Sequence, residues 1–213
     1  MKNKIISYTL GEELFSSISH GVGALFGVAA LVLMVIKSAL AGSALKVVCS
    51  AVFGASIIIL YSMSTLYHAI TNKTAKAVFR ILDHTTIFIL IAGTYTPICL
   101  ITLGGALGWT IFGIQWGVAA LGITLNAISI ERFKVFSMIG YVALGWCVVF
   151  AAKPMIENMA PAGLWLMLLG GLFYTGGIIF YALKKVKYMH SVWHLFVLAG
   201  TVTQTFSIAN YIL

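Results

Sequence analysis

Long apolar runs dominate this chain, and they leave it few ways to fold. Seven such runs, each of about 20 residues, cover residues 17–37, 45–70, 79–102, 106–130, 134–152, 162–183 and 189–212. About 20 apolar residues are what an α-helix needs to cross the hydrocarbon core of a bilayer. Only 8% of the residues are charged, against about a quarter in an ordinary soluble domain. The sequence therefore predicts an all-α integral membrane protein, a seven-transmembrane helix bundle.

Basic residues are unevenly distributed around these runs. With the N-terminus inside the cell, ten of them fall on the cytoplasmic side: Lys2, Lys4, Lys73, Lys76, Arg80, Arg132, Lys134, Lys184, Lys185 and Lys187. The outer side holds Lys37, Lys46 and Lys153. Membrane proteins concentrate Lys and Arg in their cytoplasmic loops. The bias predicts a multi-pass protein of the cell membrane with a cytoplasmic N-terminus and a C-terminus outside. It also accounts for the net charge of +8 without nucleic acid as a partner.

The breaks between the runs are short, so residues 1–213 are expected to form a single domain of antiparallel helices. Thr9 and Glu12 have the spacing of a capping box, in which each residue satisfies a backbone N–H of the other. This spacing predicts a short cytoplasmic interfacial segment at about residues 1–16. Glu12 and Glu13 also interrupt the N-terminal apolar stretch, so a cleavable signal peptide is not expected.

All five histidines and the only aspartate fall near the cytoplasmic end of a predicted span. They are His20 in the first run, His68 in the second, Asp83 and His84 in the third, and His190 and His194 in the seventh. Ionisable side chains are costly inside a bilayer and usually mark a functional site there. Four spans are thus predicted to bring these side chains to one membrane depth.

His190 and His194 are four residues apart, which places both imidazoles on one helical face about 6 Å apart. His68 is at the matching depth to supply a third nitrogen. Three neutral imidazoles and a water form the open tetrahedral site of a catalytic zinc ion. No cluster of thiolates or methionines argues for copper(I). The sequence therefore predicts Zn²⁺ held by His68, His190 and His194. Histidines that face lipid headgroups, or a proton relay through Asp83, are the alternatives.

Two further side chains are candidate catalytic groups. Asp83 is placed to accept a proton from the zinc-bound water or to orient it. Ser64 precedes His68 by one helical turn, so its hydroxyl is expected to bond the water or a substrate carbonyl. A nucleophilic serine would need an adjacent base, and the sequence does not show one. His84 is expected to face headgroups or support the site, and His20 to bond Glu12, Glu13 or the outer nitrogen of a ligand.

The same residues carry a resemblance to a known family. The motif Ser64xxxHis68, the triplet Leu82-Asp83-His84 and the segment HSVWH from His190 to His194 resemble the haemolysin III family. This family is the bacterial branch of the progestin and adipoQ receptors, which include the adiponectin receptors. The stretches EELFSSISHGVG, ILDHTTIFILIAGTYTP and HSVWHLFVLAGT extend the likeness over essentially the whole chain.

The resemblance implies a seven-helix bundle with a cytoplasmic-side zinc ion. By motif position, His68, His190 and His194 match the family's ligands, and Ser64 and Asp83 match its polar partners. The receptor branch is linked to ceramidase activity, in which zinc-activated water cleaves a lipid amide. The bacterial branch is named for haemolysis, with pore formation proposed. Two features depart from these patterns: Gln204 stands where bacterial relatives are expected to carry a further histidine, and only about 15 residues precede the first span, which argues against hormone binding.

The sequence thus favours a zinc-dependent hydrolase of a lipid amide or ester, in which Asp83 acts as general base and then as general acid. Its substrate would be a membrane lipid that enters laterally from the bilayer. The alternatives are a haemolysin, pore-forming or membrane-remodelling protein, a receptor or sensor with a structural zinc, and a proton-coupled transporter. A pore is disfavoured because no ring of charges lines a predicted span.

Overall fold

The computed structural model describes residues 8–183 and 185–213, and within these it contains seven helices of membrane-spanning length. The helical segments are α1 (Leu10–Leu40), α2 (Ala44–Ala69), α3 (Lys73–Pro97), η1 (Ile98–Leu103), α4 (Gly105–Ile128), α5 (Ile130–Gly145), η2 (Cys147–Ala151), α6 (Ala152–Asn158), α7 (Pro161–Ala182) and α8 (Met189–Tyr211). The predicted seven-span, all-α fold is confirmed.

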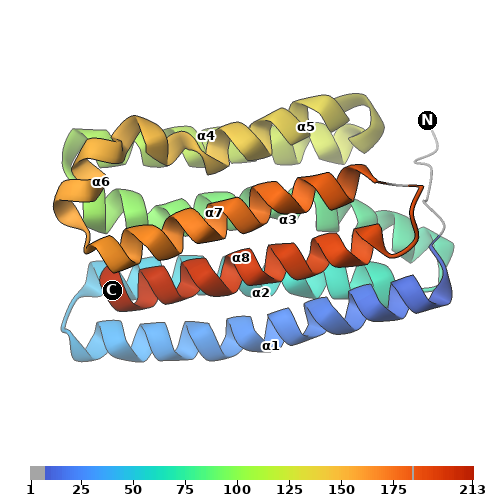
Figure 1. The fold of residues 1–213 in the computed structure, drawn as a ribbon, viewed down its shortest axis with the longest axis horizontal. Coiled ribbons are helices and arrows are strands. Elements are labelled where there is room, and N and C mark those ends of the chain that lie inside the picture. Colours follow the sequence, from blue (N-terminus) through green and yellow to red (C-terminus); the bar gives the residue numbers. More distant parts are fainter. Residues whose placement is uncertain (1–7, 184) are drawn as a thin grey trace.

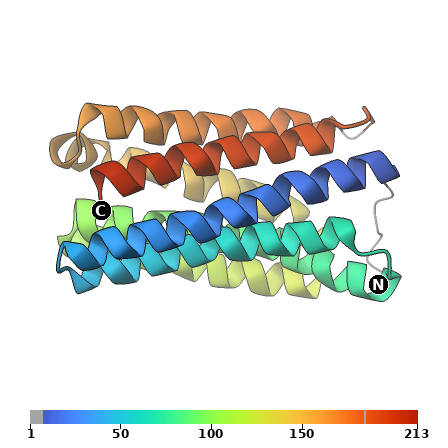
Figure 2. The same cartoon turned by 90° about the horizontal axis from the view of Figure 1, so that it is seen from below.

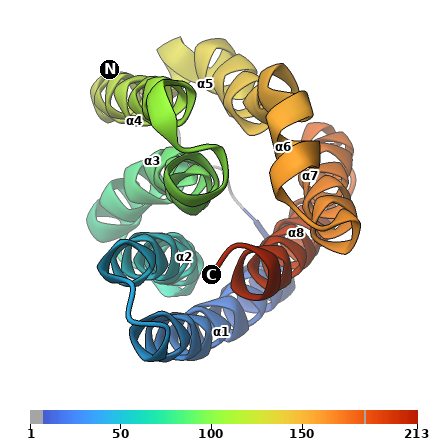
Figure 3. The same cartoon turned by 90° about the vertical axis from the view of Figure 1, so that its left-hand side faces the viewer.

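The spans run antiparallel in chain order (Figure 1). Viewed along the bundle, they form a ring from α1 through α5 and α7, and α8 returns beside α1 (Figure 3). α1 packs against both α2 and α8 (Figure 2). We call the end at which α1, α3, α5 and α8 begin the histidine end, because it carries the histidines discussed below. That this end faces the cytoplasm stays a prediction from the charge distribution.

The capping box forms at the predicted residues, but it starts the first span itself. The Thr9 hydroxyl accepts from the Glu12 amide at 3.3 Å, and a Glu12 carboxylate oxygen accepts from the Thr9 amide at 2.8 Å. From Leu10 the helix continues unbroken to Leu40, because no helix-stop signal separates the first turns from the apolar run. The interfacial segment expected at about residues 1–16 is therefore, from Leu10 onward, part of α1. Residues 1–7 lie outside the described residues.

Two spans are irregular, and one side chain links their irregularities. After Pro97, α3 widens into the π-helical segment η1, and α5 gives way at Gly145 to the 3₁₀ segment η2. The Tyr95 hydroxyl donates to the Gly145 carbonyl at 2.7 Å and accepts from the Val148 amide at 2.9 Å. Backbone polar groups freed by a helix break need such partners in a membrane. Tyr95 thus stabilises the break in the fifth span.

A polar junction inside the bundle holds three spans in register. The Thr201 hydroxyl of α8 accepts from the Tyr61 hydroxyl of α2 at 2.8 Å and lies 2.8 Å from that of Tyr174 on α7. Gly23 of α1 lies directly against the Tyr61 ring, where a Cβ atom would clash. This close approach fixes Tyr61, which packs edge-on against His20 near the histidine end.

Candidate metal centre and its two cavities

Three histidines meet at the histidine end of the bundle. His68 lies in the last turn of α2, and His190 and His194 lie in the first two turns of α8. One ring nitrogen from each lies within 4.8 Å of the others. The Nε2 atoms of His190 and His194 are 3.1 Å apart. Two nitrogens bound to one tetrahedral zinc at its usual bond length are roughly 3.3 Å apart. The spacing therefore suits ligands of a single ion.

The orientation of His68 also suits a metal ligand. Its Nδ1 atom lies 2.6 Å from Oε2 of Glu13, and Oε1 of Glu13 lies 2.8 Å from Nζ of Lys76. Its Nε2 atom is buried and has no hydrogen-bond partner among the described residues. A carboxylate on the outer nitrogen fixes the tautomer and ring orientation of metal-binding histidines. The donor set thus fits a metal ion, for which Nε2 of His68 is the available nitrogen.

The two predicted catalytic residues lie near the cluster and are both buried. Asp83 is 6% exposed and lines a cavity together with His20 and His190. Its carboxylate lies 3.6 Å from Nδ1 of His84, and it is not part of the three-histidine group. Ser64 is 1% exposed, and its hydroxyl has no partner among the described residues. The structure therefore places Asp83 against a cavity, and Ser64 within the packed interior one turn from His68.

His20 has other partners than the sequence suggested, whereas the position of His84 beside Asp83 does not contradict the supporting role expected for it. His20 makes no hydrogen bond to Glu12 or Glu13; its ring stacks on that of His194 with centroids 3.8 Å apart. The reason is that Glu12 caps α1 and Glu13 pairs with His68. Nδ1 of His84 lies 3.0 Å from the carbonyl oxygen of Arg80, inside the same helix.

Glu13 and Lys76 are the site residues that sequence reasoning missed. Ser16 and His20 follow Glu13 by three and seven residues, which puts all three on one face of α1. The Ser16 hydroxyl lies 3.0 Å from that of Ser191 on α8. This polar face on an otherwise apolar helix was the available signal. No such signal pointed to Lys76, because the bias of basic residues toward the cytoplasmic side already accounted for it.

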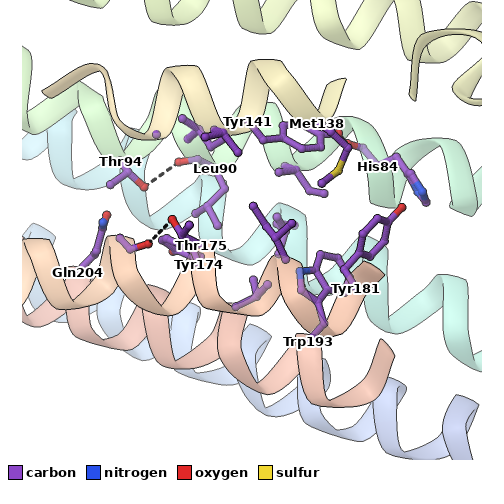
Figure 4. Close-up of a pocket in the computed structure, with 18 of the residues that line it drawn as sticks. His84, Leu90, Thr94, Met138, Tyr141, Tyr174, Thr175, Tyr181, Trp193 and Gln204 are labelled. Atoms are coloured by element: carbon purple, nitrogen blue, oxygen red, sulfur yellow. Dashed lines mark hydrogen bonds between the residues drawn. The ribbon is translucent and has the colours of Figure 1, made fainter. Parts of the chain in front are cut away.

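An apolar cavity of about 160 Å³ extends from the histidines into the membrane-spanning part of the bundle. Its histidine end is lined by Asp83, His190 and Trp193, and its far end by Thr94 and Gln204. Figure 4 shows Trp193 and Tyr181 side by side at one end and Gln204 and Thr94 at the other. Gln204, the departure from the bacterial pattern, thus lies far from the metal ligands. We call this space the apolar cavity.

A second cavity, of about 250 Å³, adjoins the first at the histidine end, and we call it the polar cavity. The start of α1, the end of α7 and the segment between α7 and α8 supply most of its lining: Tyr8, Thr9, Glu12, Tyr181, Lys185, Val186 and Lys187. His84, Tyr181 and His190 line both cavities. The Tyr8 ring stacks on that of His190, with centroids 4.7 Å apart. Burial raises the pKa of the Tyr8 phenol well above its usual range, so it is a neutral donor.

The fold defines a multi-pass membrane protein. The model of the family described as "Haemolysin-III related" matches residues 8–205. Hemolysin-3 of Bacillus cereus is 42% identical over 202 residues, which cover 95% of this chain and 92% of that protein. The Hemolysin-3 homolog of Bacillus subtilis is 41% identical over 204 residues, 96% of each chain.

The chain belongs to the haemolysin III family. A more distant similarity links it to the human monocyte to macrophage differentiation factor, 26% identical over 168 residues, which cover 76% of this chain and 69% of that protein. This relative supports the wider kinship with progestin and adipoQ receptors that the motifs indicated. No solved structure gives a significant match.

Proposed function

We propose that this protein is a zinc-dependent hydrolase that cleaves a lipid amide or ester within the membrane. One observation carries the proposal: His190 is both a member of the three-histidine cluster and part of the lining of the apolar cavity. A metal ion held by this cluster would face a space suited to an acyl chain. Largely apolar cavities with a few convergent polar groups are typical ligand sites.

In this proposal some side chains hold the metal ion and others move a proton. A bound zinc ion supplies Lewis acidity, which polarises a carbonyl group and lowers the pKa of a nearby water. Glu13 fixes the His68 ring, so that Nε2 is presented to the ion. Asp83, which lines the cavity, acts as the general base that takes the proton of the attacking water and returns it to the leaving atom. The Ser64 hydroxyl, which is buried and has no hydrogen-bond partner among the residues that the structure describes, donates to the water or the carbonyl.

The substrate in this proposal is a membrane lipid. The wall of the apolar cavity contains Leu60, Ile87, Leu90, Ile91, Ile178 and Val197. Such a wall binds an acyl chain and excludes water from it. A lipid already in the bilayer would enter laterally between helices.

Metal analysis beside lipid hydrolysis tests the proposal. Purified wild type should hold about one zinc per chain, and His68→Ala should lose it. Wild type should release fatty acid from an amide or ester lipid, and Asp83→Asn should not, although it keeps the metal. Glu157→Gln is the control, because it also removes one carboxylate, but from an exposed side chain at the end of the bundle opposite the histidine end. Zinc-free wild type, or hydrolysis that survives Asp83→Asn, would overturn the proposal.

A structural zinc, as in a receptor or sensor, is the second candidate. Its support is that the three ligands come from α2 and α8, while Glu13 adds α1, so that a metal would join three helices. Zinc content together with a lower melting temperature in His68→Ala, and no hydrolysis of any lipid tested, would favour this candidate.

Lysis of cells is the third candidate, favoured by the name Hemolysin-3 of the Bacillus cereus relative. Purified protein would then lyse red cells, and a pore would not need the cluster. Lysis that persists in the His190→Ala, His194→Ala double variant would favour a pore over a hydrolase. Lysis that disappears in it would favour chemistry at the cluster.

A further inference from the structure

The two cavities differ in polarity, and they lie on the two sides of His190. The apolar cavity follows α8 from His190 to Gln204, fourteen residues and therefore a rise of about 21 Å. The polar cavity opens on the other side, toward the end of the bundle. His84, Tyr181 and His190 form their shared boundary. A molecule that occupies both cavities places the junction of its tail and its head beside the predicted metal ligand.

The charges that line the polar cavity favour an anion. Lys185 and Lys187 line it, and neither has a carboxylate within ion-pair distance among the described residues. Glu12, the acidic residue of this lining, already accepts from the amides of Thr9 and Tyr188, both at 2.8 Å. Its hydrogen-bonding capacity is therefore committed to the fold. The Glu12 carboxylate also interacts electrostatically with Lys187, but at a distance longer than an ion pair, so neither ammonium group has a carboxylate ion-pair partner among the described residues.

The backbone that carries these lysines is held in a defined conformation. Tyr188 has a φ angle of 64°, a left-handed value that is uncommon for a residue other than glycine. Its amide donates to Glu12 and so ties the segment before α8 to the start of α1. The Tyr8 side chain, whose ring stacks on His190, adds a phenol group to the lining. The polar cavity is thus a formed site with its donors around it.

We propose that the polar cavity binds the anionic head group of an acyl amphiphile whose chain lies in the apolar cavity. The assignment of the cleaved bond rests on the proposed hydrolase function. The substrate class is then a fatty acyl group joined through an amide or ester to a small head that carries a carboxylate or phosphate. Hydrolysis breaks the bond between the acyl carbon and the head nitrogen or oxygen; hydroxide joins the carbon and a proton joins the head. The fatty acid remains in the apolar cavity, and the head leaves through the polar one.

A generic attraction offers a simpler account of the lysines. Basic residues beside a membrane attract anionic lipids wherever they lie. The proposed site is more specific than such an attraction. Among the lysines and arginines that the structure describes, Lys185 and Lys187 are the two that line the polar cavity. Lys73 is exposed at the same end of the bundle and lines neither cavity. Its substitution therefore distinguishes a general attraction of anionic lipids from binding in the polar cavity.

Binding of matched ligands tests the inference. N-oleoylglycine and oleoyl lysophosphatidic acid carry an anionic head, whereas N-oleoylethanolamine has the same chain and a neutral head. Each ligand is titrated into the full chain in a neutral detergent. The protein carries Asp83→Asn, which prevents turnover in the proposed mechanism. Tryptophan fluorescence reports binding beside Trp193. We expect at least one anionic ligand to bind about ten-fold more tightly than the neutral one. The two anionic arms distinguish a carboxylate from a phosphate.

The lysine variants decide the location of the site. Lys185→Gln combined with Lys187→Gln should remove most of the preference for the anionic ligand, and Lys73→Gln should keep it. Equal affinities in the parent protein, a preference that survives the double variant, or an equal loss in Lys73→Gln would overturn the inference. If no lipid is hydrolysed but the lysine-dependent preference holds, the hydrolase proposal fails and the binding site stands. If neutral and anionic lipids are hydrolysed equally well, the hydrolase stands and the head-group site fails.

Discussion

Oε2 of Glu13 lies 2.6 Å from Nδ1 of His68, although the two residues are 55 positions apart in the chain. The contact joins the first turns of α1 to the last turn of α2. The other carboxylate oxygen of Glu13 is held by Lys76 at 2.8 Å. Glu13 thus couples a predicted metal ligand to a fixed positive charge, and it determines which ring nitrogen of His68 is presented to the cluster.

Replacing Glu13 by Gln should weaken zinc binding by about 10- to 100-fold, because loss of a carboxylate partner makes a ligating imidazole less basic and less well oriented. Competition with a chromophoric chelator would measure the zinc affinity. Glu131→Gln removes a carboxylate from the same end that pairs with Arg80 rather than with a histidine, so it should leave the affinity unchanged. An unaltered zinc affinity in Glu13→Gln would mean that this contact does not support the ligand.

His20 offers a test of stability that is separate from metal binding. Both of its ring nitrogens are buried without a hydrogen-bond partner among the described residues. A buried polar group left unpaired costs about 1–3 kcal/mol. His20→Phe keeps a flat ring against His194 and removes both nitrogens, so it should raise the free energy of unfolding by about that amount and leave the zinc content unchanged.

Chemical unfolding in detergent would give the free energy for His20→Phe, and metal analysis would give the zinc content. Phe88→Leu changes a buried ring elsewhere in the bundle and should lower stability, which checks the sensitivity of the method. Loss of zinc from His20→Phe would show instead that His20 belongs to the metal site.

The break in the fifth span yields a third prediction. Tyr95→Phe removes one hydroxyl that serves both the Gly145 carbonyl and the Val148 amide. Water is scarce at this depth, so both backbone groups would lose their partner, and the protein should become less stable by about 1–3 kcal/mol. Thermal unfolding would detect this change, with the partly exposed Tyr211→Phe as the control. A melting temperature equal to that of wild type would show that the break has other support.

The number of spans, their antiparallel order and the identity of the clustered histidines could be predicted from the sequence. The reason is physical: crossing a bilayer demands long apolar runs, and each ionisable residue within them stands out against its neighbours. His190 and His194 share a helix, so local geometry alone predicted their approach. His68 joined them because its depth in the span followed from the count.

Other features depend on which helices become neighbours, and no local pattern determines that. Glu13 meets His68, and His20 stacks on His194, because α1 packs against both α2 and α8. Likewise, the end of α5 at Gly145 depends on Tyr95 from α3, and neither helix shows this alone.

Narrowing the apolar cavity should separate chain binding from metal binding. Leu90 lines this cavity and is 4% exposed (Figure 4). Leu90→Trp replaces an isobutyl group by a bulky indole ring in a cavity of about 160 Å³. It should therefore obstruct a long acyl chain while the histidines keep their positions. We expect the affinity for an oleoyl ligand to fall by about ten-fold or more, since burial of a few methylene groups is worth that much. An octanoyl ligand with the same head should bind as it does to wild type, and the zinc content should not change. Leu121→Trp adds the same ring to an exposed position on α4 and controls for the tryptophan itself. An equal loss of affinity for both chain lengths would show that the acyl chain does not extend along this cavity past Leu90.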